Sequence, residues 1–137
     1  MSMTLEEIDA FLAEPHLCHF ATIDANGLPR VRPLWYLWKD GEFWLTTRTQ
    51  ARFTGRDLAS SPRVALSIGS EYRPYRAVVV HGRPEVVAKD RDMLIAISTR
   101  YGDEPGSPWT VEAMEQDDRV LLKLTPERLF SWDYAKD

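Results

Sequence analysis

The feature that most constrains this chain is a predicted strand over residues 30–38 that is apolar on both faces. Alternate residues of a strand point to opposite sides. One side here carries Val31, Pro33, Trp35 and Leu37, and the other side carries Leu34, Tyr36 and Trp38. Pro33 also has no N–H to donate to a neighbouring strand. The Asp40-Gly41 pair then predicts a tight hairpin to a second strand over residues 43–47. We therefore expect something besides the core of the domain to lie against the first strand.

Hydroxyl and cationic residues follow this hairpin directly. Thr46 and Thr47 end the second strand, and residues 50–60 read as a short helix that Pro62 closes. Arg48, Arg52, Thr54 and Arg56 follow the strand within one or two helical turns. Arginines bind phosphate, and hydroxyls suit a ribityl chain, so the region predicts a site for a flat, anionic cofactor. On the alternative interpretation, the threonines are strand formers, the tryptophans are core and the arginines are surface residues.

The charge distribution is also typical of a local anion site. The net charge of -4 argues against nucleic acid as the main partner. Residues 30–83 nevertheless contain ten Lys and Arg against four Asp and Glu, and nine of the ten cations are arginines. Arginine suits bidentate contacts to phosphate or carboxylate.

Other kinds of chemistry lack a sequence signal. His16, His19 and His81 have no zinc-type ligand cluster around them. Nucleophile-elbow, P-loop and G-x-G-x-x-G motifs are absent, so redox chemistry would depend on a bound cofactor. The single cysteine, Cys18, excludes a disulfide framework, and the acidic N-terminus does not read as a signal peptide. We expect a cytoplasmic protein without a membrane partner.

The remaining pattern predicts one mainly β (α+β) domain over residues 1–137. Helices are expected at residues 5–13, 50–60, 91–101 and 108–116, and strands at residues 17–23, 30–38, 43–47, 63–68, 75–87, 120–124 and 129–132. Gly82 and Pro84 predict a bend in the long strand, and the last two strands are expected to pair with each other. Six or seven short strands with a few helices favour a small barrel or sandwich with helical caps.

Five segments together resemble a known family. They are FATIDANGLPRVRPLW (20–35), FWLTTR (43–48), RDLASSPRVALS (56–67), YRAVVVHGRPEVV (75–87) and TPERLFSWD (125–133). Their order resembles the FMN-binding split β-barrel family related to pyridoxamine 5'-phosphate oxidase, which includes flavin- and deazaflavin-dependent reductases. The resemblance implies a six- to seven-stranded split β-barrel with short capping helices. It also implies a homodimer that holds FMN between its subunits, and hydride transfer at that flavin.

The resemblance further implies a set of cofactor-binding residues, with no catalytic side chain among them. They are Arg32, Pro33, Leu34, Trp35, Thr46, Thr47, Arg52, Thr54, Arg56 and Trp132. Residues 32–35 would line the flavin ring, the two adjacent threonines the ribityl chain, and Arg52 and Arg56 the phosphate, while Trp132 would reach in from the other subunit. Thr54 stands where many relatives have a phosphate-binding lysine. One lost charge-assisted hydrogen bond costs about 1.5–3 kcal/mol, or one to two decades of affinity.

Several alternatives stay open at this point. The 8-hydroxy-5-deazaflavin coenzyme could replace FMN, with its acidic tail on Arg73, Arg76 and Arg83. The chain could instead bind a flavin or haem without turnover, with His19 or His81 as the haem ligand, or serve as a cofactor-free interaction domain. The aromatic content favours a small planar organic substrate. Pyridoxamine phosphate is not expected as the substrate. The vitamin B6 oxidases have a C-terminal Arg-Leu substrate motif, and the only similar pair here, Arg128-Leu129, stands in a different sequence context.

Overall fold

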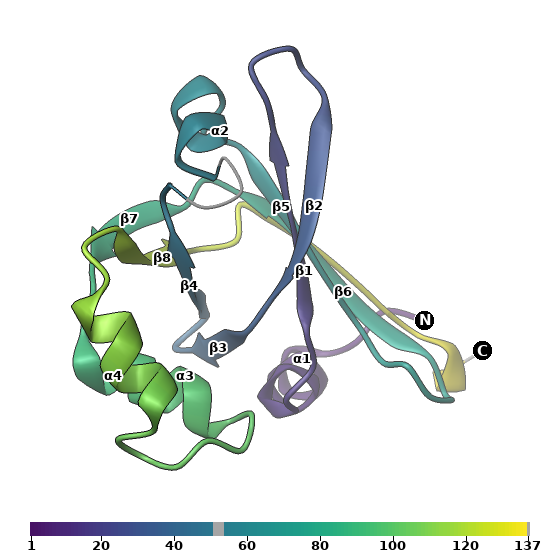
Figure 1. The fold of residues 1–137 in the computed structure, drawn as a ribbon. Coiled ribbons are helices and arrows are strands. Elements are labelled where there is room, and N and C mark those ends of the chain that lie inside the picture. Colours follow the sequence, from purple (N-terminus) through teal and green to yellow (C-terminus); the bar gives the residue numbers. More distant parts are fainter. Residues whose placement is uncertain (51–53, 137) are drawn as a thin grey trace.

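The computed structural model describes residues 1–50 and 54–136, which form two antiparallel sheets and four α-helices (Figure 1). Sheet A contains, in spatial order, β2 (Pro29–Leu34), β1 (Cys18–Ile23), β5 (Val64–Gly69), β6 (Arg76–Gly82) and β9 (Arg128–Asp133). Sheet B contains β3 (Tyr36–Lys39), β4 (Glu42–Arg48), β8 (Arg119–Leu124) and β7 (Glu85–Ala88). The helices are α1 (Leu5–Ala13), α2 (Thr54–Ser60), α3 (Arg91–Thr99) and α4 (Pro108–Glu115), and a 3-10 turn spans Tyr134–Lys136. The mainly β, α+β fold with short helices is thus confirmed.

The described residues contain nine strands where six or seven were predicted, because two predicted strands each divide in two. The stretch 30–38 divides at Trp35 into β2 and β3, and the stretch 75–87 divides after Gly82 into β6 and β7. At both points the chain leaves sheet A and enters sheet B. The predicted pairing of the last two strands is wrong: β8 pairs with β4 and β7, whereas β9 pairs with β6. Periodicity along one segment carries no information about which sheet the segment joins.

The change of sheet also explains how the two-faced apolar run is covered. Tyr36 is fully buried in the main core, while Trp35 and Leu37 pack in a second cluster with residues of α3 and α4. Val31 and Pro33 belong to β2, which is an edge strand of sheet A, and both are exposed. An edge position is where a strand tolerates proline.

The main core lies between the two sheets and α1, and it contains Phe11, Phe20, Tyr36, Phe43, Leu66 and Val80, among other residues. The second cluster lies between sheet B and the pair α3 and α4, with Leu94, Ile97, Ala113 and Leu121 at its centre. Local signals set the element ends. Thr4 and Glu7 form a capping box at α1, and Asp40 and Gly41 both have positive φ in the β3–β4 turn, as a tight hairpin requires.

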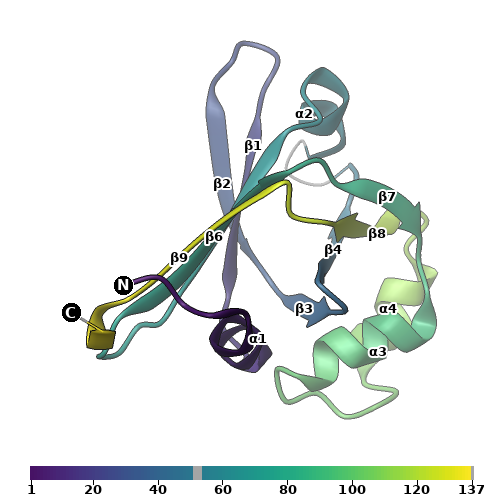
Figure 2. The same ribbon diagram turned by 180° about the vertical axis from the view of Figure 1, so that it is seen from behind.

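One face of sheet A points away from sheet B, and Figures 1 and 2 show no helix over it. We call it the outer face. By strand alternation and register, it carries Ile23, Val31, Pro33, Val79, Phe130 and Trp132. Val31 is 65% exposed and Phe130 is 42% exposed. The outer face therefore presents apolar surface.

The two edges of sheet A differ in how they end. At β2, Pro29 and Pro33 lack an N–H. At β9, the Asp133 N–H donates to the Met1 carbonyl, and the Met3 N–H donates to Ser131 Oγ.

No helix of the described ranges is both long enough and apolar enough to cross a lipid bilayer.

Candidate anion-binding site

A cavity of about 270 Å³ brings together residues of both sheets and the first residue of α2. It is lined by Arg32 and Leu34 of β2, Thr46, Thr47 and Arg48 of β4, Thr54 of α2, and Arg119 of β8. Three guanidinium groups, three hydroxyl groups and one apolar side chain thus face a common space. Because guanidinium groups and hydroxyls all donate hydrogen bonds, the lining is suited to an anion.

Arg32 is held from behind by a buried polar network. Arg32 is 6% exposed, and its Nη2 donates to Thr22 Oγ1 at 2.9 Å. Thr22 in turn donates to Asp57 Oδ2 at 2.8 Å. The same carboxylate oxygen lies 3.7 Å from Arg32 Nη2 and 3.0 Å from Arg30 Nε. Asp57, which is 2% exposed on α2, therefore ties that helix to β1 and β2 and orients Arg32.

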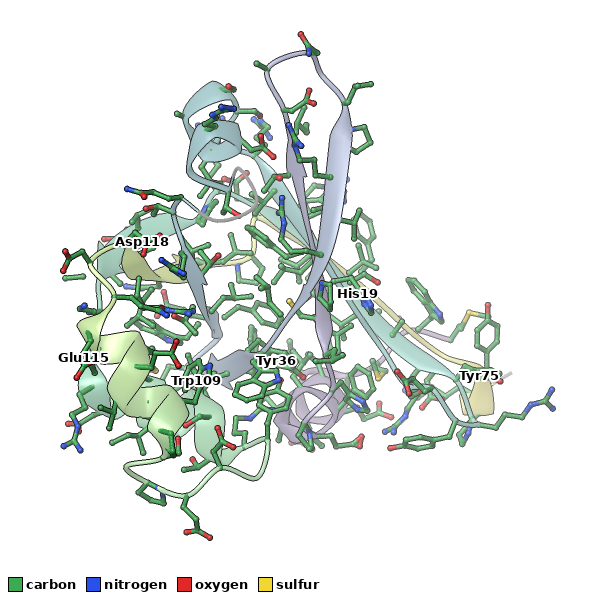
Figure 3. All side chains as sticks on the ribbon, viewed as in Figure 1. His19, Tyr36, Tyr75, Trp109, Glu115 and Asp118 are labelled. Carbon is green, nitrogen blue, oxygen red and sulfur yellow. The ribbon has the colours of Figure 1, made fainter. Side chains whose placement is uncertain are left out.

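Arg48 and Arg119 face each other across the β4–β8 pair, in which they are register partners. Arg48 Nε donates to Asp118 Oδ1 at 2.9 Å, and this bond is the main reason that the pKa of Asp118 lies below its usual value. Burial, and then the charge of Arg48, lower the pKa of Arg119. Figure 3 shows Asp118 near the end of β4, on the flank of the molecule opposite Tyr75.

Arg119 has neutral partners. Its Nε donates to Gln116 Oε1 at 3.0 Å, and its Nη1 donates to Thr46 Oγ1 at 3.4 Å. The guanidinium carbon lies 5.7 Å from the centre of the Trp109 ring, within cation–π range. Two hydrogen bonds and one cation–π contact thus fix the position of this side chain at the cavity.

The start of α2 approaches β4 closely because residue 55 is glycine. The Gly55 N–H donates to the Thr49 carbonyl at 2.9 Å, and a Cβ at position 55 would lie 2.5 Å from that oxygen. Any side chain there would force the backbone apart. The close approach places the buried Thr54 against the cavity.

Five of the ten predicted cofactor residues line this cavity: Arg32, Leu34, Thr46, Thr47 and Thr54. The structure places four others elsewhere. Pro33 and Trp132 lie on the outer face, Arg56 is exposed on α2, and Trp35 stacks on Tyr101 with ring centres 4.8 Å apart. Arg52 lies outside the described residues. Of the two further arginines, Arg48 was noted in the sequence as a possible phosphate ligand, whereas Arg119 was missed.

A wider cleft of about 520 Å³ lies between the α1–β1 loop and the start of the β5–β6 loop. Its lining includes His16, His19, Ser67, Glu71 and Tyr72, but no arginine. Within the described ranges, no group of three or more His, Cys, Asp or Glu is placed to hold a metal ion. The three-arginine cavity is therefore the stronger candidate site.

Fold and cavity together define an antiparallel split-barrel protein whose cationic cavity is built from both sheets. A family model described as pyridoxamine 5'-phosphate oxidase matches residues 4–133, and the chain belongs to this family. It is 31% identical, over 119 residues, to the pyridoxine/pyridoxamine 5'-phosphate oxidase of Cupriavidus taiwanensis. That match covers 86% of this chain and 55% of the relative, so the chain spans about half the length of the curated relatives it matches.

Two solved structures have the same fold. A conserved hypothetical protein from Mycobacterium tuberculosis is 27% identical, with a TM-score of 0.82 over 98% of this chain and 87% of that chain. A protein described as an F420 reductase is 25% identical, with a TM-score of 0.72 over 88% of this chain and 94% of that chain. The family resemblance noted in the sequence is thus confirmed.

Proposed function

We propose that this chain is an FMN-binding oxidoreductase that works as a homodimer. The observation that carries the proposal is the cavity in which Arg32, Arg48 and Arg119 converge beside the hydroxyls of Thr46 and Thr47. A flavin bound there would supply hydride transfer, a reaction that amino-acid side chains do not carry out without a cofactor. Membership of the pyridoxamine 5'-phosphate oxidase family supports a flavin-type cofactor.

The lining offers partners for several parts of FMN. Arginines bind a phosphate bidentately, and the two adjacent threonines offer hydroxyls to a ribityl chain. Leu34 gives an apolar contact at the cavity wall. A volume of about 270 Å³ is below the range of roughly 300–1,000 Å³ typical of ligand pockets. The phosphate and ribityl chain would therefore occupy the cavity, and the ring would extend beyond it.

A second copy of the chain is the proposed cover for that ring. The outer face of sheet A is apolar, and none of the helices shown in Figures 1 and 2 covers it. Burial of Val31 and Phe130 against a partner would be favourable, because both are large, apolar and exposed. Trp132 lies on the same face, so a dimer formed there would bury it at the interface between the subunits.

Flavin binding is the direct test. Purified protein is stripped of any ligand and titrated with FMN while the quenching of flavin fluorescence is followed. We expect saturation at one FMN per chain in the wild type and weaker binding in Arg48→Gln. The control is Arg91→Gln, which removes an exposed arginine from α3, away from the cavity. Absence of FMN binding by the wild type would refute the proposal.

The oligomeric state is tested separately by sedimentation equilibrium. A dimer is expected for the wild type, and Val31→Asp should shift it toward the monomer because the new carboxylate would be buried without a partner. A wild-type protein that stays monomeric at micromolar concentration would contradict the dimer.

The second candidate cofactor is the 8-hydroxy-5-deazaflavin coenzyme, because one structural relative is described as an F420 reductase. Of the arginines suggested for its acidic tail, Arg76 begins β6, Arg73 lies in the loop before it, and Arg83 lies between β6 and β7. Arg76 pairs with Glu14 at 3.0 Å, and Arg83 lies 3.9 Å from Glu127. Neither lines the cavity. A parallel titration with this coenzyme decides between the two cofactors.

A further inference from the structure

The three arginines of the cavity differ in how their charge is balanced. Arg32 lies near Asp57, and Arg48 is paired with Asp118. Among the described residues, Arg119 forms no ion pair within 4.0 Å, and its hydrogen-bond partners Gln116 and Thr46 are neutral. The carboxylates of Asp118 and Glu112 therefore offset the charge of Arg119 only from beyond that distance.

The position of Arg119 makes this charge costly without a ligand. It is the register partner of Arg48, and like charges directly opposite each other on paired strands are destabilising. Burial and the Arg48 charge lower the pKa of Arg119 by more than the charges of Asp118 and Glu112 raise it, so its surroundings on balance disfavour the positive form. An anion at the cavity would offset both effects.

The side chain is nevertheless held in place. The bonds to Gln116 and Thr46 and the Trp109 ring define where the guanidinium lies. A group fixed in advance loses little freedom when it binds. Arg119 thus combines a charge without a carboxylate partner within 4.0 Å among the described residues with a preset position, which is what recognition of a second negative charge requires.

We propose that Arg119 is the residue that selects a terminal phosphate monoester, and so FMN, over flavins whose phosphate is esterified twice. The inference rests on the proposed FMN site. A phosphate monoester carries a charge of about -1.5 to -2 at pH 7, whereas a phosphodiester carries one negative charge. Coulomb attraction scales with the product of the charges. The charge of Arg119, which no ion pair ties up, therefore favours the monoester, while Arg32 and Arg48 contribute hydrogen bonds that both ligand types can accept.

The test varies the charge of the ligand and of the residue independently. Wild type, Arg119→Gln, Arg119→Lys and the control Arg91→Gln are titrated with three flavins by fluorescence quenching. The flavins are FMN, its phosphate monomethyl ester with one negative charge, and uncharged riboflavin. Riboflavin reports whether the cavity itself is intact.

We expect Arg119→Gln to weaken FMN binding by about 10- to 100-fold, as for the loss of one charge-assisted bond. Binding of the methyl ester should weaken less, so that the preference for FMN over the ester falls several-fold. Riboflavin binding should weaken least, because riboflavin carries no charge. Arg119→Lys keeps the charge and should retain most of the preference, and Arg91→Gln should behave as the wild type.

Each other outcome has one meaning. If the wild type binds none of the flavins, the proposed function fails and the inference falls with it. If the wild type binds FMN but Arg119→Gln keeps its preference over the ester, the inference alone is overturned. An equal loss of all three flavins also overturns it, because Arg119 would then only support the cavity.

A measurement on the wild type covers the case in which Arg119→Gln does not fold. Salt screens the attraction between charges, so raising the salt concentration should weaken binding of FMN more steeply than binding of the methyl ester. Equal salt dependence for the two ligands would overturn the inference.

Discussion

Replacement of Asp57 by asparagine should destabilise the protein strongly, because one carboxylate serves three partners. Its Oδ2 accepts from Thr22 Oγ1 at 2.8 Å and lies 3.0 Å from Arg30 Nε and 3.7 Å from Arg32 Nη2. Removal of one member of a buried ion pair costs about 3–5 kcal/mol. Asparagine keeps an acceptor for the Thr22 hydroxyl, so we expect a loss near 3 kcal/mol, the lower end of that range.

The assay is equilibrium unfolding in urea, with the free energy of unfolding extrapolated to water. The matched control is Asp117→Asn, an exposed aspartate between α4 and β8, which should change the free energy by less than about 0.5 kcal/mol. The double variant with Arg32→Gln should lose less than the sum of the two single variants, since the two residues act on one another. A loss of less than about 1 kcal/mol in Asp57→Asn would show that the network does not hold α2 in place.

Two pH effects are also expected from groups outside the cavity. Burial raises the pKa of the Cys18 thiol to about 12, whereas an unfolded thiol ionises near pH 8.5. Between these values the folded state holds the extra proton, so the free energy of unfolding should fall as pH rises, by up to about 1.4 kcal/mol per unit. When urea titrations are repeated from pH 8 to 9.5, the free energy of unfolding of Cys18→Ala should fall less steeply with pH than that of the wild type. At the acidic end, hydrogen bonds from Lys136 and Thr4 lower the pKa of Glu7 from 4.5 to about 2. The stabilisation from Glu7 is complete above pH 4.5 and disappears as pH falls toward 2, and Glu7→Gln should flatten this part of the profile; an unchanged profile would contradict the role of these bonds.

Local sequence signals located most of the elements well. The capping box at Thr4 and the spacing of apolar residues predicted α1 at residues 5–13, where the structure has it. The Asp40-Gly41 turn follows the same logic, and the structure has Asp90 and Ser107 as the N-caps of α3 and α4. Such signals act between neighbours in the chain, so they can be read without knowledge of the fold.

Features that depend on distant pairing could not be read in this way. The run at residues 30–38 gave no sign that it changes sheet at Trp35, because apolar side chains face a core in both sheets. Arg119 was missed as a site residue for a related reason. Its place at the cavity follows from the pairing of β8 with β4, and nothing near residue 119 in the sequence shows that Arg48 will lie beside it.

The way sheet A ends at its two sides has a consequence for the behaviour of this protein at high concentration. Unprotected strand edges are templates on which further chains add and grow into aggregates. Here the prolines of β2 interrupt one template, and the first residues of the chain cover part of the other through their bonds to β9. Association of copies by endless sheet extension is therefore disfavoured, and truncation of residues 1–3 should make the protein more prone to form fibrils.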